Sequence, residues 1–162
     1  MKKISSEISY DLYDSANELP ETDRQLLNDA ISAAGTAYAP YSNFHVGAAV
    51  LMENGQIVKG SNQENAAYPS GLCAERVAVF AAGAHYPGIK IKAIAITAMF
   101  NDLKDLLSVS PCGDCRQVMA EYEHRYHANI RLIMTAENGK IMVIPNVQTL
   151  LPLMFNGENL KK

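Results

Sequence analysis

The segment from Ile91 to Ala98 is an almost continuous run of apolar residues, and several of them are β-branched. A strand with one face in water alternates apolar and polar residues, so a continuous run indicates a strand that is buried on both faces of a sheet. Such a strand needs helices on both sides of the sheet to cover it. This segment therefore predicts an α/β fold.

The neighbouring segments have the periodicities that this fold requires. Apolar residues recur at helical spacing between Leu26 and Tyr38, and Asn54-Gly55 and Asn138-Gly139 are typical of tight hairpin turns. Helices are predicted at residues 21–38, 73–84, 111–126 and 147–151, and strands at 46–51, 57–58, 91–98, 130–135 and 141–144. We expect a mixed five-stranded sheet flanked by helices on both faces. Residues 100–110 are expected to form a loop with room for one turn of helix.

The chain has 162 residues, of which 48% are hydrophobic and 19% charged, as expected for one folded domain. We place this domain at residues 21–162. Residues 1–20 form a polar N-terminal extension, in which Ile8, Tyr10 and Leu12 alternate as in an edge strand.

The net charge of −3 argues against a binding surface for a nucleic-acid polymer, which needs clustered lysines and arginines. The sequence contains no run of the roughly 18 apolar residues that a membrane-spanning helix requires. Lys2 and Lys3 are not followed by the apolar core of a signal peptide. We therefore expect a cytoplasmic protein that binds neither a nucleic-acid polymer nor a membrane.

The three cysteines, Cys73, Cys112 and Cys115, all lie near predicted helix starts. An odd number of cysteines in a cytoplasmic chain argues against a disulfide framework. A helix N-terminus stabilises a thiolate, and three thiolates bind Zn²⁺ while leaving one coordination position open, as in catalytic zinc sites. Two alternatives stay open here. A histidine could complete a structural zinc site, or Cys112 and Cys115 could form a thioredoxin-like redox pair.

Two charged residues after Cys73 suit a catalytic zinc site. Glu75 can reach the open position without occupying it, take a proton from a zinc-bound water whose pKa is about 7, and return it to a substrate nitrogen. Zinc with three thiolates carries one net negative charge, and we hypothesise that Arg76 offsets it by donating to a ligand sulfur. Taken alone, Glu75 would be a solvated helix residue and Arg76 a partner of Asp114 or Glu121.

Together these motifs resemble the homotetrameric cytidine deaminases. Cys73-Ala74-Glu75-Arg76 and the segment Pro-Cys-Gly-Asp-Cys-Arg-Gln at residues 111–117 are similar to the zinc-binding motifs of that family. Residues 38–49 resemble its segment before the first strand, residues 60–68 its nucleoside loop, and residues 150–155 its C-terminal segment. The blocks occur in the family's order.

The resemblance implies hydrolytic deamination of free cytidine and 2′-deoxycytidine to uridine and 2′-deoxyuridine, with release of ammonia, as in pyrimidine salvage. It implies one Zn²⁺ per subunit and a homotetramer with sites near subunit interfaces. The implied roles are zinc binding by Cys73, Cys112 and Cys115, proton transfer by Glu75, base binding by Phe44 and the Ala74 N–H, ribose binding by Asn62 and Glu64, and contact with a neighbouring subunit's pocket by Phe155.

The sequence departs from the family pattern at His45, at residues 69–71 and at residues 99–110. These departures leave the substrate open, since a deaminase of another aminopyrimidine nucleoside, such as an aminonucleoside antibiotic, would use the same site. Two non-deaminase alternatives explain less of the sequence. A non-enzymatic zinc-binding protein has no need of Glu75, and a dithiol redox protein has no need of Cys73.

Overall fold

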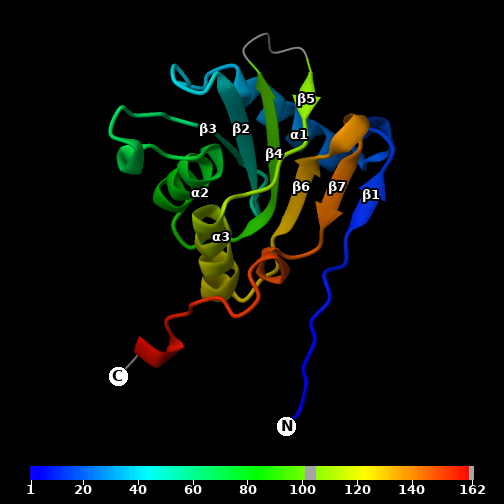
Figure 1. The fold of residues 1–162 in the computed structure, drawn as a ribbon, viewed down its shortest axis with the longest axis vertical. Coiled ribbons are helices and arrows are strands. Elements are labelled where there is room, and N and C mark those ends of the chain that lie inside the picture. The colour runs from blue at the N-terminus through cyan, green and yellow to red at the C-terminus, as the bar shows by residue number, and fades with distance from the viewer. Residues whose placement is uncertain (101–104, 161–162) are drawn as a thin grey trace.

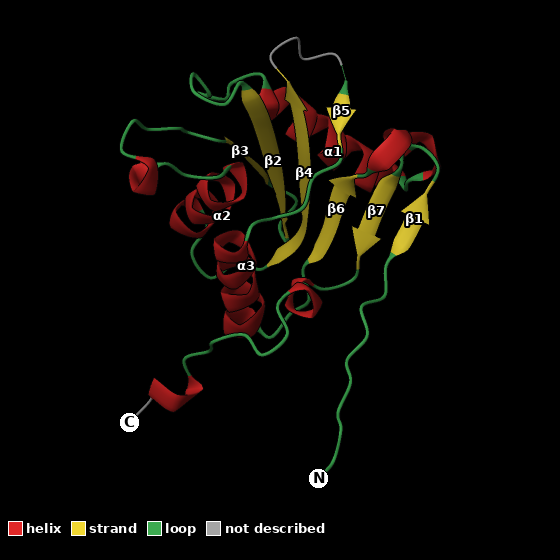
Figure 2. Ribbon diagram, viewed as in Figure 1, coloured by secondary structure: helices red, strands yellow, loops and turns green. Residues whose placement is uncertain are grey.

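The computed structural model describes residues 1–100 and 105–160. A single sheet carries α1 (Glu21–Ala34) on one face and α2 (Ala74–His85) and α3 (Gly113–Tyr126) on the other (Figures 1 and 2). This arrangement confirms the α/β fold with helices on both faces of the sheet. Within the described residues, the helices are all too short or too polar to cross a membrane.

The strands are β1 (Asp11–Tyr13), β2 (Phe44–Met52), β3 (Ile57–Ser61), β4 (Ile91–Phe100), β5 (Leu106–Leu107), β6 (Arg131–Thr135) and β7 (Ile141–Ile144). Their order is β1-β7-β6-β4-β2-β3, with β5 paired to β4. β4 and β6 are parallel and α3 lies in the connection between them, whereas the other pairs are antiparallel. β4 is the predicted buried central strand, with residues 93–96 fully buried.

The predicted number of five strands is wrong, because the sheet has seven strands within the described residues. β1 pairs with β7, as expected for an edge strand in the extension, and β5 pairs two residues with the end of β4. The predicted five strands did not include the edge strand of the extension. β5 is too short to show a periodicity of its own, and hydrogen bonding to the longer β4 forms it. The turn of helix considered for residues 100–110 falls partly on 101–104, outside the described residues, and residues 106–107 form a strand instead.

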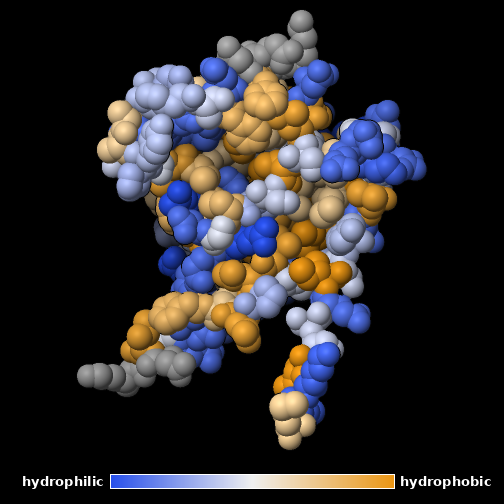
Figure 3. All heavy atoms as spheres, in the orientation of Figure 1, coloured by the Kyte–Doolittle hydropathy of each residue, from blue (hydrophilic) through white to orange (hydrophobic). Residues whose placement is uncertain are grey.

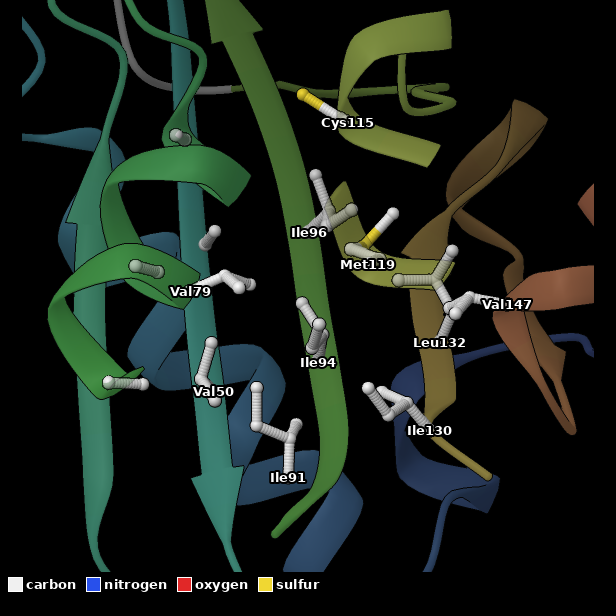
Figure 4. Packing of buried hydrophobic residues seen from close by; sticks show 14 of the residues in the cluster. Val50, Val79, Ile91, Ile94, Ile96, Cys115, Met119, Ile130, Leu132 and Val147 are labelled. Carbon is white, nitrogen blue, oxygen red and sulfur yellow. The ribbon is translucent and has the colours of Figure 1, made fainter. Parts of the chain in front are cut away.

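The core has two halves, one on each side of the sheet. Ile94 and Ile96 of β4 pack with Met119 of α3 in one half (Figure 4), and Ala93 and Ala95 of the same strand pack beneath α1 in the other. Successive residues of a strand point to opposite faces, so β4 contributes to both halves. Both predicted hairpins are present, joining β2 to β3 and β6 to β7.

Gly60 of β3 allows α2 to lie very close to the sheet. A Cβ at this position would be 2.5 Å from the Ala78 amide nitrogen and 2.7 Å from the Ala74 carbonyl oxygen. Both are backbone atoms, which cannot move aside as a flexible side chain can. The absence of a side chain at Gly60 therefore allows the first turns of α2, where Glu75 lies, to approach the sheet closely.

The N-terminal extension has two parts with different contacts. Residues 1–10 extend away from the body and expose side chains such as Ile4 (Figures 1 and 3). Residues 11–19 belong to the folded body, since they include β1, and Leu19 is only 5% exposed in the core half beneath α1. The second part of the extension therefore contributes to the sheet and to the core.

Candidate active site

The three predicted zinc ligands come together where α2 and α3 begin. Cys73 directly precedes α2, Cys112 directly precedes α3, and Cys115 lies in the first turn of α3. The Sγ atom of Cys112 is 3.8 Å from that of Cys73 and 3.4 Å from that of Cys115. A tetrahedral zinc ion with Zn–S bonds of about 2.3 Å places its sulfurs about 3.8 Å apart. The cluster therefore fits a zinc ion held by three thiolates.

The composition of this cluster bears on the alternative of a structural zinc site. Among residues 1–100 and 105–160, the side chains that could share one metal ion here are the three cysteines alone, with no histidine. Three protein ligands leave a coordination position for water or substrate, whereas a structural site is closed by four. The cluster therefore has the composition of a catalytic site.

The three thiols strongly influence one another's ionisation. The pKa of Cys73 falls to about 5, chiefly because the Cys115 thiol donates a hydrogen bond to it, and the Arg76 guanidinium adds to the effect. The pKa of Cys115 is raised, first by that same hydrogen bond and then by burial. Ionisation of one cysteine thus opposes ionisation of its neighbour, and a bound cation would allow all three thiols to ionise.

Glu75 lies in the first turn of α2 and is 5% exposed. Burial raises the pKa of its carboxyl group above the usual value. Its side chain lines the same cavity as Cys73 and Cys112, so a carboxyl group lies beside the cysteine cluster. This is the placement that the spacing between Cys73 and Glu75 predicts.

Arg76 makes both of the contacts that the sequence suggested. Its Nη2 atom lies 3.8 Å from the Cys73 Sγ atom, and its Nη1 atom lies 3.9 Å from the Asp114 Oδ2 atom. Asp114 is largely exposed, so its contact with Arg76 is a weak surface ion pair. The contact with the sulfur agrees with the hypothesis that Arg76 offsets the negative charge of the ligands.

A cavity of about 750 Å³ opens beside the cysteine cluster. Its walls contain seven of the predicted site residues: Phe44, Asn62, Glu64, Cys73, Glu75, Arg76 and Cys112. Ala74, between Cys73 and Glu75, and Cys115, three residues after Cys112, are fully buried and do not line the cavity. Phe155 does not line this cavity. It lies in the C-terminal tail and is 68% exposed, while its carbonyl oxygen accepts a hydrogen bond from Gln117.

Asn62 and Glu64 follow β3 and hold the start of β2 by hydrogen bonds. The Asn62 side chain accepts from the Val46 N–H at 2.8 Å and donates to the Phe44 carbonyl at 2.9 Å. Glu64 accepts from the Ser42 hydroxyl and from the backbone N–H of Ser42 and Tyr41. The pKa of Glu64 is lowered, chiefly by the hydrogen bond from the Ser42 hydroxyl. This wall of the cavity therefore presents an ionised acceptor.

Sequence reasoning missed several residues of the cavity wall, among them Tyr41, Ser42, Tyr68, Val109 and Ser110. The first three lie inside the segments 38–49 and 60–68, which resemble deaminase segments, so their positions could have indicated a place in the site. The last two follow β5 in a stretch with no recognisable pattern. They reach the cavity because the Val109 N–H donates to the carbonyl of Thr135 on β6.

Comparison with protein families decides which kind of site this is. Residues 20–140 match the family described as the cytidine and deoxycytidylate deaminase zinc-binding region, and the match contains all three cysteines and Glu75. The chain belongs to this deaminase family. The family is a zinc-binding one, and the cluster of three cysteines could hold its metal ion.

Individual relatives and solved structures agree with membership of the deaminase family. The chain is 41% identical to a cytidine deaminase of Halalkalibacterium halodurans over 139 residues, which are 85% of this chain and 98% of that protein. A crystal structure of cytidine deaminase from Burkholderia pseudomallei is 37% identical, with a TM-score of 0.70, over 85% of this chain and all of the other. The Mycobacterium tuberculosis cytidine deaminase structure is 33% identical, with a TM-score of 0.63, over 82% and 95% of the two chains.

The deaminase match begins at residue 20, so most of the N-terminal extension precedes it. The relative from Halalkalibacterium halodurans is matched over nearly its whole length, yet it accounts for only 85% of this chain. The family match therefore leaves out residues 1–19.

Proposed function

We propose that the protein catalyses the zinc-dependent hydrolysis of free cytidine and 2′-deoxycytidine to uridine and 2′-deoxyuridine, with release of ammonia. The observation that carries the proposal is the buried carboxyl of Glu75 beside the Cys73, Cys112 and Cys115 cluster, in one cavity of about 750 Å³. A proton carrier next to a three-thiolate site provides the two components that hydrolytic deamination requires.

In this proposal each group of the site has a separate task. Zinc, when bound by the three cysteines, supplies a Lewis acid that makes water nucleophilic near neutral pH. Glu75 takes the proton from the attacking water, whose oxygen bonds to C4 of the pyrimidine. Glu75 then delivers this proton to N3, takes the proton of the hydroxyl now on C4 and passes it to the amino group, and the C4–N4 bond breaks to release ammonia. Its raised pKa suits a group that must both take and give a proton.

The charges in the cavity support a nucleoside rather than a nucleotide as the substrate. Among the described residues in the wall, Arg76 is the one lysine or arginine, and it already contacts Cys73 and Asp114. Glu64 and Glu75 contribute carboxyl groups to the same wall. A 5′-phosphate would find no cation to pair with there, which disfavours its binding. Asn62 and Glu64 instead suit a neutral sugar hydroxyl, with Phe44 and the Ala74 N–H assigned to the base.

The proposal extends to the assembly and its location. Phe155 is exposed in the tail and does not line its own subunit's cavity, which supports a role at a neighbouring subunit in a homotetramer. Three cysteines kept as metal-binding thiols suit a reducing compartment, which supports the cytoplasm. Residues 1–20 are proposed as an extension of a single deaminase domain formed by residues 21–162.

The decisive experiment measures cytidine conversion by the zinc-loaded protein, from its ultraviolet spectrum and from released ammonia. Glu75→Gln should lower kcat by about 10³-fold, since it keeps the size of the side chain and removes the proton carrier. Zinc content, measured in parallel, should stay at one per chain in both proteins.

The possible results separate the competing functions. If the folded, zinc-loaded protein does not convert cytidine, the cytidine assignment fails, and a panel of other aminopyrimidine nucleosides comes next. Full activity of Glu75→Gln would contradict the assigned proton transfer. No activity on any member of the panel would leave a zinc-binding protein without catalysis.

A further inference from the structure

We propose that Ser42 is a positioning residue, which holds the Glu64 carboxylate in the orientation that receives the sugar of the substrate. The inference rests on the proposed function, in which Asn62 and Glu64 bind the ribose 3′-hydroxyl. It adds a residue and a mechanism that the deaminase motifs do not assign.

The Ser42 hydroxyl is committed to two partners. It donates to the Glu64 Oε1 atom at 2.5 Å and accepts from the Phe44 N–H at 3.0 Å. A hydroxyl has one proton to donate, and here Glu64 receives it. Ser42 therefore links the acceptor of the sugar site to the backbone of the residue assigned to the base.

Glu64 is held at both of its oxygen atoms. The Oε2 atom accepts from the Tyr41 N–H at 2.9 Å and the Ser42 N–H at 3.3 Å, while the Oε1 atom accepts from the Ser42 hydroxyl. A carboxylate oxygen has two lone pairs, so Oε1 keeps one for a substrate hydroxyl. The hydroxyl of Ser42 thus fixes the orientation of the oxygen that is free to accept.

Phe44 is held from its other side by Asn62. The Asn62 amide donates to the Phe44 carbonyl at 2.9 Å and accepts from the Val46 N–H at 2.8 Å. Between Ser42 and Phe44 the chain turns through Asn43, which has a left-handed φ of 55°. Base and sugar contacts therefore form one hydrogen-bonded unit, and Ser42 is its connection to Glu64.

Loss of the hydroxyl should affect substrate binding more than chemistry. Without Ser42 Oγ, Glu64 loses the hydrogen bond that orients Oε1, but the proton carrier and zinc ligands lie on other elements. An interaction lost equally in the ground state and the transition state raises KM and leaves kcat unchanged. The effect should also require the sugar hydroxyl that Glu64 binds.

The experiment compares Ser42→Ala with wild-type enzyme on cytidine and on 3′-deoxycytidine, which lacks the hydroxyl in question. On cytidine, Ser42→Ala should raise KM by about 5- to 20-fold with kcat within about 2-fold of wild type. On 3′-deoxycytidine, the KM values of the two proteins should agree within about 2-fold. Ser42→Thr keeps the hydroxyl and should restore the KM for cytidine. Ser70→Ala, which removes an exposed serine hydroxyl from the turn Tyr68–Ser70, is the matched control.

Two results would overturn the proposal. Unchanged KM for cytidine would show that Glu64 needs no support from Ser42. Equal losses on both substrates would show that Ser42 acts through Phe44 or through folding. If Ser42→Ala is too unstable to assay, Ser42→Cys keeps the size with a weak donor, and the same substrate contrast is expected. Wild-type enzyme inactive on cytidine would contradict the proposed function itself, before any variant is compared.

Discussion

At the residue scale, two glutamates of one cavity acquire opposite properties from their surroundings. Burial raises the pKa of Glu75, whereas the Ser42 hydroxyl and two backbone amides lower the pKa of Glu64. A carboxyl that gains and loses a proton suits general acid–base work, and a stably ionised one suits reception of a hydroxyl. The roles that we propose for the two glutamates therefore agree with their local burial and hydrogen bonding.

Arg76 gives the first prediction at this scale. Because its guanidinium contacts the Cys73 sulfur, Arg76→Ala should leave the three-thiolate site too negative and lower kcat/KM for cytidine by about 10- to 100-fold. Asp114→Asn removes only the exposed partner of Arg76 and should stay within about 2-fold of wild type. Steady-state kinetics and zinc loss to a competing chelator measure both effects. Wild-type kinetics and zinc retention in Arg76→Ala would contradict the role.

At the element scale, the long periodic segments can be predicted from the sequence, and the shortest strand cannot. The continuous apolar run identifies β4, the alanine- and valine-rich segment identifies α2, and Pro111 marks the start of α3. The edge strand indicated in the extension is present as β1 but was not counted among the five strands, and β5 exists only through two residue pairs with β4. Ser42 lies in a segment that resembles the family, but it was missed as a site residue because its role depends on a hydrogen bond to Glu64, 22 residues away.

The close approach of α2 to the sheet at Gly60 can be tested by substitution. Gly60→Ala would force its Cβ against backbone atoms of Ala74 and Ala78, and it should destabilise the fold by about 1–3 kcal/mol. Because Cys73 and Glu75 lie where α2 begins, kcat and zinc affinity should fall as well. Gly157→Ala is the control, since a Cβ there has no atom within 4 Å. Thermal melting, zinc content and kcat test this, and a Gly60→Ala protein equal to wild type in all three would refute it.

At the scale of the whole molecule, the deaminase match and the folded body do not begin at the same residue. The match starts at residue 20, but β1 and Leu19 already belong to the sheet and the core. The sequence indicated a polar extension and an edge strand, while the burial of Leu19 depends on packing beneath α1. Residue 20 therefore marks the start of the family match and not the start of the folded body.

Two truncations test whether the folded body begins at β1 or at residue 20. Removal of residues 2–10 deletes the part that extends from the body, and it should change the melting temperature by less than about 2 °C. Removal of residues 2–19 also deletes β1, the Asp14–Lys140 ion pair and Leu19, and exposes the edge of β7. Burial of one leucine is worth about 2 kcal/mol, and each kcal/mol shifts the melting temperature of a chain this size by about 2–4 °C. The longer truncation should therefore melt at least 5 °C lower and aggregate more readily through its open edge.

Both truncated proteins should keep the wild-type kcat at 25 °C, because the cavity is built from residues 41–112. Melting curves and size-exclusion chromatography decide the matter, and equal stability of the two truncations would show that the folded body begins at residue 20 after all.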